Sequence, residues 1–203
     1  ITDNQSFYWK LGAWTLAQAR SGQKFKEVFM VGASGQNSVA ILSYRNRALK
    51  TNPDIMAYLH LWGNDIIESG VDMNIITQRW NAFEDCVLSD LRYGKKVIIG
   101  TELPRALIDS TSAFANYVPG IQTQKWHFIN DKIRKLGELD GVYISDYSDC
   151  YIDPNYVNPV YPDNTTTFVI GSGATQKFTL DGSHPYLAGH WYISNRLTVT
   201  LES

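Results

Sequence analysis

The chain has 203 residues, of which 44% are apolar and 19% charged, enough for one sizeable core. Its 18 Lys and Arg against 20 Asp and Glu give a formal net charge of -2, which leaves no basic footprint for a nucleic-acid backbone. Apolar runs reach only strand length, and no charged segment precedes a hydrophobic one, so neither a membrane span nor a signal peptide is visible. We therefore predict a single domain over residues 1–203.

Strand and helix patterns alternate through most of the chain. Helical spacing of apolar residues predicts helices at 3–20, 75–91 and 122–139. Short apolar runs predict strands at 27–31, 54–61, 96–99 and 141–145. This alternation indicates an α/β fold with a central parallel sheet covered by helices on both faces, a three-layer sandwich of flavodoxin-like type. Ligand-binding loops in such a fold gather at the carboxyl ends of the strands.

The region from 151 to 180 interrupts the alternation. Three prolines are followed by two alternating apolar runs around Gly171-Ser172-Gly173, which predict a loop and then a β-hairpin insertion at about 160–180. A helix is expected from Pro185 to about Ser194. Residues 196–201 are expected to form a terminal strand or an irregular tail.

Three polar blocks follow predicted structural elements. Gly35 ends the turn Val31-Gly32-Ala33-Ser34-Gly35, and Gly63-Asn64-Asp65 follows the strand over 54–61. Asp181 and His184 lie three residues apart directly after the predicted hairpin. That spacing lets the carboxylate hold the far ring nitrogen of the imidazole and fix the tautomer that a general base needs.

This ordered set of blocks resembles the SGNH, or GDSL-type, hydrolase family, in which a turn glycine, Gly-x-Asn-Asp and Asp-x-x-His occur in the same order. The resemblance implies a serine hydrolase of the SGNH fold. His184 would be the general base and Asp181 would orient it. The backbone N–H of Gly35 and the side-chain amide of Asn64 would form the oxyanion hole. The resemblance implies no cofactor and no catalytic metal.

The nucleophile is the missing part of this pattern. Family members open with a strand that runs into Gly-Asp-Ser, usually followed by Ile-Thr, whereas this sequence begins Ile1-Thr2-Asp3. We expect the nucleophilic serine immediately before Ile1, so that the sequence lacks its first strand and nucleophile block. Ser34 is the rival candidate, but a nucleophile elbow would need glycine where Gln36 stands. Ser34 also lies too close to Asn64 to replace the first block.

Several other residues near these blocks could have either a structural or a functional role. Asp65 is expected to brace the Asn64 turn rather than to take part in catalysis. Glu102 follows the third predicted strand and is expected to face solvent, with binding of substrate hydroxyls as the alternative. Trp62 could line the cleft or point into the core, and His60 could support the Asn64 turn.

The cysteines and histidines do not indicate a metal centre. Cys86 and Cys150 permit one disulfide but are expected to be free thiols. The four histidines are scattered without the spacing of a zinc motif, so no metal site is predicted.

The resemblance favours a serine esterase that removes a small acyl group, most simply acetyl, from a carbohydrate or polysaccharide. Aromatic residues make up 13% of the chain and suit stacking on sugar rings, and those near the expected loops are Trp62, Tyr147, Tyr151, Tyr156, Tyr161 and Tyr186. The alternatives are a non-catalytic carbohydrate-binding relative that has lost its serine, or a lysophospholipase or thioesterase. The residues do not fix the oligomeric state, and an extracellular location is slightly favoured.

Overall fold

A computed structural model of the chain describes residues 22, 35–68, 70–103, 121–150, 185 and 187–202. Three strands in this part form a parallel sheet in the order β1-β2-β3, with bounds Ile55–Tyr58, Lys96–Gly100 and Val142–Ser145. In the register of the sheet Met56 pairs with Val97, which pairs with Val142. These three strands and their parallel pairing confirm the sequence prediction.

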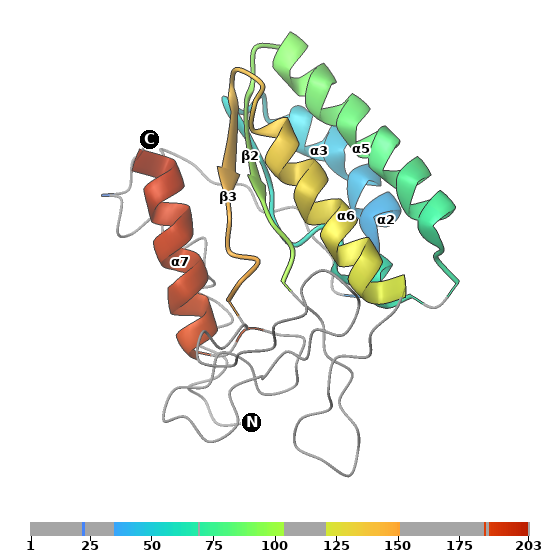
Figure 1. The fold of residues 1–203 in the computed structure, drawn as a ribbon. Coiled ribbons are helices and arrows are strands. Elements are labelled where there is room, and N and C mark those ends of the chain that lie inside the picture. The colour runs from blue at the N-terminus through green and yellow to red at the C-terminus, as the bar shows by residue number, and fades with distance from the viewer. Residues whose placement is uncertain are drawn as a thin grey trace.

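Helices cover both faces of this sheet. The described helices are α2 (Ser38–Ser43), α3 (Arg45–Leu49), α4 (Gly63–Ile67), α5 (Met73–Arg92), α6 (Ile121–Leu136) and α7 (Leu187–Glu202). Helices α5 and α6 lie together on one side of the sheet and α7 lies on the other (Figure 1). The three-layer α/β sandwich is therefore confirmed.

Helix α5 shows how the sequence pattern produces this packing. The Asp72 side chain caps the helix by accepting a hydrogen bond from the Ile75 N–H at 2.9 Å. Ile76, Trp80 and Phe83 recur at helical spacing and are fully buried. Helix α6 repeats the pattern, with Trp126, Ile129, Ile133 and Leu136 buried as predicted.

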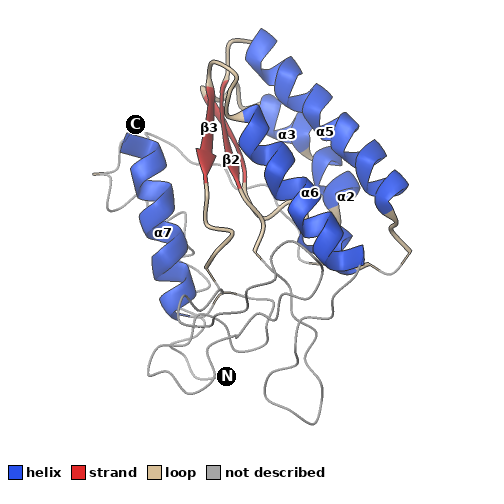
Figure 2. Ribbon diagram, viewed as in Figure 1, coloured by secondary structure: helices blue, strands red, loops and turns tan. Residues whose placement is uncertain are grey.

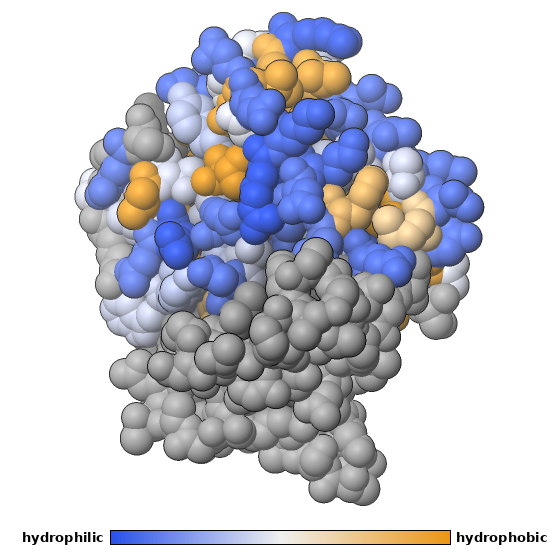
Figure 3. All heavy atoms as spheres, in the orientation of Figure 1, coloured by the Kyte–Doolittle hydropathy of each residue, from blue (hydrophilic) through white to orange (hydrophobic). Residues whose placement is uncertain are grey.

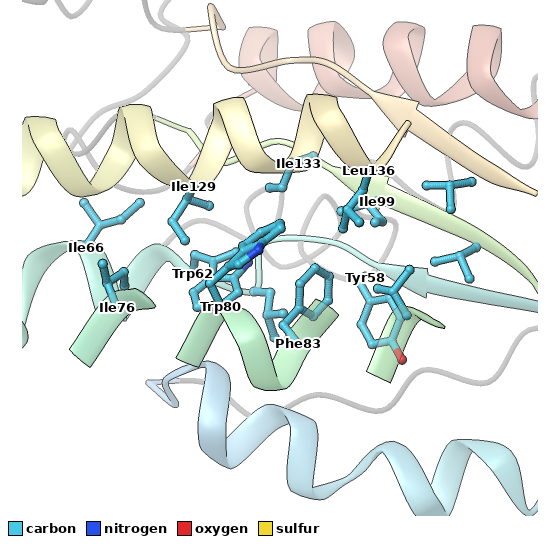
Figure 4. Packing of buried hydrophobic residues seen from close by; sticks show 14 of the residues in the cluster. Tyr58, Trp62, Ile66, Ile76, Trp80, Phe83, Ile99, Ile129, Ile133 and Leu136 are labelled. Carbon is cyan, nitrogen blue, oxygen red and sulfur yellow. The ribbon is translucent and has the colours of Figure 1, made fainter. Parts of the chain in front are cut away.

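The main core lies between the sheet and these two helices (Figure 4). At its centre the Trp62 ring stacks on the Trp80 ring with centroids 5.8 Å apart, and Phe83 meets Trp62 edge-on at 5.6 Å. Aromatic pairs in these geometries contribute about 0.5–1.5 kcal/mol beyond their buried area. Trp62 therefore points into the core, which decides between its two predicted orientations.

Helix α7 corrects the prediction for the C-terminal segment. Residues 196–201 are helical, not a strand or an irregular tail, and the helix continues to Glu202. Ile193 and Leu197, one turn apart, are both 1% exposed and join a second core cluster. The Thr198 and Thr200 hydroxyls donate to the carbonyls of Ser194 and Arg196, the fourth residue back in each case. These bonds let β-branched threonines sit in a helix.

The two loops that follow β2 and β3 leave the sheet at the same end (Figure 2). In the view of Figure 3 the described surface is mostly hydrophilic, with apolar side chains in small separate groups. Among the described helices, none has the length and apolar character needed to span a bilayer. The predicted helix over 3–20, the strand over 27–31 and the hairpin at about 160–180 lie outside the described residues.

Candidate active site

The segment that begins at Gly35 ends in a capped helix. Gly35 has a φ of +73°, in the left-handed region that glycine adopts without strain. Two residues later Asn37 caps α2, where its side-chain oxygen accepts a hydrogen bond from the Ala40 N–H at 3.1 Å. The backbone from Gly35 to Asn37 is therefore fixed where it enters the helix.

Asn64 lies in the first turn of α4, which starts soon after the chain leaves β1. Its side-chain Nδ2 donates a hydrogen bond to the backbone carbonyl of Gln36 at 2.7 Å. This bond brings together the two blocks expected to supply the oxyanion hole, because Gln36 is the neighbour of Gly35. An amide nitrogen carries two protons, so the bond to Gln36 leaves one for another acceptor.

Asp65 ties the same two segments together from below the surface. Its carboxylate is fully buried and accepts hydrogen bonds from the Ser38 N–H at 2.7 Å and the Ser38 hydroxyl at 2.9 Å. Arg79 of α5 donates to the same carboxylate at 2.5 Å. Asp65 thus anchors the start of α2 to α4, which agrees with the bracing role predicted for it.

Two basic side chains, Arg79 and Lys125, bind residues of α4 and its C-cap. Burial acts to lower the pKa of Arg79, but the hydrogen bond and charge of Asp65, and then those of Glu68, outweigh burial and raise it. Burial lowers the pKa of Lys125, and the charges of Asp65 and Glu68 oppose that shift. The Lys125 ammonium donates to the backbone carbonyls of Asp65 at 2.9 Å and Glu68 at 3.0 Å, at the C-terminal end of the helix.

Glu102 follows β2, where the sequence predicts a solvent-facing side chain. In the structure this side chain is fully buried, so that prediction is wrong. One carboxylate oxygen, Oε1, accepts a hydrogen bond from the Trp62 N–H at 2.7 Å. Nothing in the local sequence Thr-Glu-Leu-Pro indicates this burial, because the groups that cover Glu102 come from other elements.

Hydrogen bonds join the segment that follows β3 to the segment that follows β2. The Thr101 hydroxyl donates to Asp146 at 3.1 Å and accepts from the Tyr147 N–H at 2.9 Å. Burial, followed by the charge of Glu102, raises the pKa of Tyr147 well above its ordinary value. Tyr147 and Trp62 are both buried, so neither ring is exposed for stacking on a sugar.

Of the predicted site residues, Gly35 and Asn64 lie within the described part of the chain. Gly35 and Asn64 are brought together, whereas Asp181, His184 and Ser34 lie outside the described residues, as do the other four aromatics of the predicted rim. Cys86 and Cys150 are free thiols, as expected. The described residues contain no group of three or more His, Cys, Asp or Glu side chains arranged to hold a metal ion.

Comparison with solved structures gives a consistent result. A GDSL-like lipase from Bacteroides thetaiotaomicron superposes with a TM-score of 0.64 at 17% identity, covering 93% of this chain and 82% of its own. The chain has the fold of the GDSL-type hydrolases. A protein assigned as an acylhydrolase from Bacteroides fragilis shares that GDSL-type fold with a TM-score of 0.64 at 18% identity, covering 93% of this chain and 80% of its own.

A third structure of the same fold comes from a different source. An α/β hydrolase enzyme from the metagenome of Lake Arreo, Spain, superposes with a TM-score of 0.60 at 18% identity, covering 95% of this chain and 83% of its own. Comparison of the sequence with protein-family models and with curated proteins gives no match. The structure thus establishes the GDSL-type fold. The sequence identities are too low to indicate which substrate the protein uses.

Proposed function

We propose that the protein is a serine esterase that hydrolyses small acyl esters, with acetyl groups on a carbohydrate or another hydroxylated carrier as the preferred substrates. The observation that carries the proposal is the hydrogen bond from Asn64 to the carbonyl of Gln36. The bond joins Asn64 to the residue that follows Gly35, and a neutral, non-titrating amide donor near that segment supports an oxyanion-hole assignment. The GDSL-type fold of lipases and acylhydrolases supports the same chemistry.

In the proposed mechanism a serine hydroxyl attacks the ester carbonyl while His184 takes the proton of the hydroxyl. Asp181 holds the imidazole in the tautomer that accepts that proton. The N–H of Gly35 and the Asn64 amide donate to the oxyanion of the tetrahedral intermediate. His184 then protonates the departing alcohol, and water releases the acyl group in a second round of the same steps.

The Asn64→Ala variant tests the oxyanion assignment. Loss of one such donor typically lowers kcat by about 10²- to 10³-fold, because the donor acts on charge that develops only in the transition state. We expect this loss with p-nitrophenyl acetate, with KM changed far less. Asn81→Ala is the matched control, since Asn81 is exposed on α5. An unchanged kcat in Asn64→Ala would exclude Asn64 from the oxyanion hole.

Labelling of the full-length protein with a fluorophosphonate identifies the nucleophile. The expected result is one phosphonyl adduct on a serine that immediately precedes Ile1, located by peptide mass spectrometry and N-terminal sequencing. An adduct on Ser34 would move the nucleophile to the second block. Absence of any adduct, together with binding of polysaccharide, would instead support the non-catalytic carbohydrate-binding alternative.

A substrate series separates the acyl groups. Acetyl esters are expected to give a higher kcat/KM than octanoyl esters, and release of acetate from acetylated xylan would support a polysaccharide substrate. A preference for long acyl chains would favour a lysophospholipase, and a preference for acyl thioesters would favour a thioesterase.

A further inference from the structure

We infer that Glu102 is a positioning residue for the proposed oxyanion hole, because its buried carboxylate holds the loop that carries Asn64. The inference rests on the proposed function and adds to it a residue from outside the three polar blocks. Glu102 is fully buried and follows β2, 38 positions after Asn64 in the sequence. It therefore cannot contact a substrate and must act through the groups that it binds.

The first contact is with the loop itself. The Trp62 N–H donates to Glu102 Oε1 at 2.7 Å, a short hydrogen bond between two buried residues. Trp62 is the N-cap residue of α4, and Asn64 follows two residues later. The Trp62 indole is held separately by its stacking on Trp80. The backbone at Trp62 is thus fixed on one side by the carboxylate and on the other by the aromatic core.

Glu102 is in turn held by helix α6. Its N–H donates to the side-chain oxygen of Asn130 at 2.7 Å, and its carbonyl accepts from the Asn130 amide at 3.1 Å and the Trp126 indole at 2.8 Å. Asn130 and Trp126 are 1% and 2% exposed, so this anchor is protected from water. The carboxylate therefore projects toward Trp62 from a backbone that cannot shift easily.

The loop before Asn64 needs such a clamp because it contains a strained residue. His60 has a φ of +54°, in the left-handed region, although it is not a glycine. A non-glycine residue held in this region costs about 1–3 kcal/mol and persists only where its surroundings enforce it. The Tyr147 ring contacts His60 with centroids 5.2 Å apart, and the Glu102 bond to Trp62 holds the chain two residues later.

Two variants separate the acceptor from the rest of the side chain. Glu102→Gln keeps an oxygen that can accept from Trp62, and we expect kcat within about threefold of the unmodified protein. Glu102→Met keeps a similar volume without the acceptor, and we expect kcat to fall by about 10- to 100-fold at nearly constant KM, as small displacements of catalytic groups do. Glu138→Ala is the control, since Glu138 is exposed and precedes β3, at the opposite end of the strands.

Coupling to Asn64 distinguishes positioning from general stability. In an Asn64→Ala background the Glu102→Met change should lower kcat by less than about threefold, because the group that it positions is already absent. An equal loss in both backgrounds would overturn the inference. If the unmodified protein hydrolyses no ester, the proposed function fails. If Asn64→Ala leaves kcat unchanged, Asn64 is no oxyanion donor and the inference fails with that assignment. If only the Glu102 variants leave kcat unchanged, the inference fails and the proposed function stands.

Hydrogen exchange supplies a readout that does not depend on a variant folding. In the unmodified full-length protein the Trp62 amide should exchange as slowly as amides within β2, because its N–H is buried and hydrogen-bonded to Glu102. Rapid exchange at Trp62 would show that the carboxylate does not hold this loop, and would overturn the inference regardless of the behaviour of Glu102→Met.

Discussion

Asp65 shows how one buried carboxylate can organise a site without touching the substrate. Its oxygens accept from both donors of Ser38, at the start of α2, and from Arg79 of α5. Because the neighbouring Asn64 binds Gln36, the two residues fix the same pair of segments through separate bonds. Removing the Asp65 bonds should therefore loosen the proposed oxyanion hole without changing its donors.

We predict that Asp65→Asn lowers the free energy of unfolding by about 3 kcal/mol, because it leaves Arg79 beside a neutral group and turns one acceptor into a donor. Urea unfolding followed by tryptophan fluorescence measures the change. Glu68→Gln is the matched control, since Glu68 also binds Arg79, at 3.3 Å, but its side chain is 47% exposed. The control should lose less than about 1 kcal/mol. Equal losses would show that the buried Asp65 carboxylate contributes no more to the free energy of unfolding than the exposed Glu68 carboxylate.

The residues of the site differ in how far the sequence could predict them. The closeness of the Gly35 and Asn64 blocks was predictable, because the sequence predicts a strand before each block and the carboxyl ends of parallel strands meet at one edge of a sheet. Glu102 was not, since its burial depends on Asn130 and Trp126, which lie more than twenty positions away on another element. A single glutamate after a strand carries no local signal of such a partner.

The helices show the same division between local and distant causes. Helices α5 and α6 were predicted correctly because each repeats apolar residues over several turns. Helices α2, α3 and α4 have five or six residues each, too few for a periodic pattern to emerge. For residues 196–201 the sequence predicted a strand or an irregular tail, whereas α7 continues through them and buries Ile193 and Leu197 in the second core.

At the level of one element, the N-cap of α5 offers a direct test. Asp72→Ala removes the hydrogen bond to the Ile75 N–H, and we expect a loss of about 1 kcal/mol in the free energy of unfolding. Asp85→Ala on the exposed face of the same helix serves as the control and should change stability little, because it also replaces aspartate by alanine but removes no cap. Thermal unfolding of the two variants side by side measures the difference. A greater loss for Asp85→Ala would contradict the capping assignment.

Across the whole molecule the sheet separates two cores and collects the candidate site at one edge. One core lies under α5 and α6, and the second joins α7 to Leu103 and Tyr147. The segment around Asn64 contributes Trp62 and Ile66 to the first core, and the loops after β2 and β3 contribute Leu103 and Tyr147 to the second. Global stability and the geometry of the site are therefore linked, and conditions that weaken the packing should affect both.

Acid should weaken this packing in two stages. Burial lowers the pKa of His127 and of His190 below the ordinary value of 6.5, so the unfolded chain binds protons more readily than the folded one. The stability that these histidines contribute is present above pH 6.5 and is lost as the pH falls through that value toward their folded pKa. Burial acts to raise the pKa of Asp146, but its bonds to Arg134 and Ser148 outweigh burial and lower it below 3.8, so a second loss follows in stronger acid.

The double variant His127→Gln and His190→Gln tests the first stage. Its free energy of unfolding, measured by urea denaturation, should depend less on pH between about 7 and 5 than that of the unmodified protein, because neither glutamine can take up a proton. Below about pH 4 the two proteins should lose stability in parallel, since Asp146 is intact in both. Identical slopes between pH 7 and 5 would show that the two buried histidines do not govern this stage.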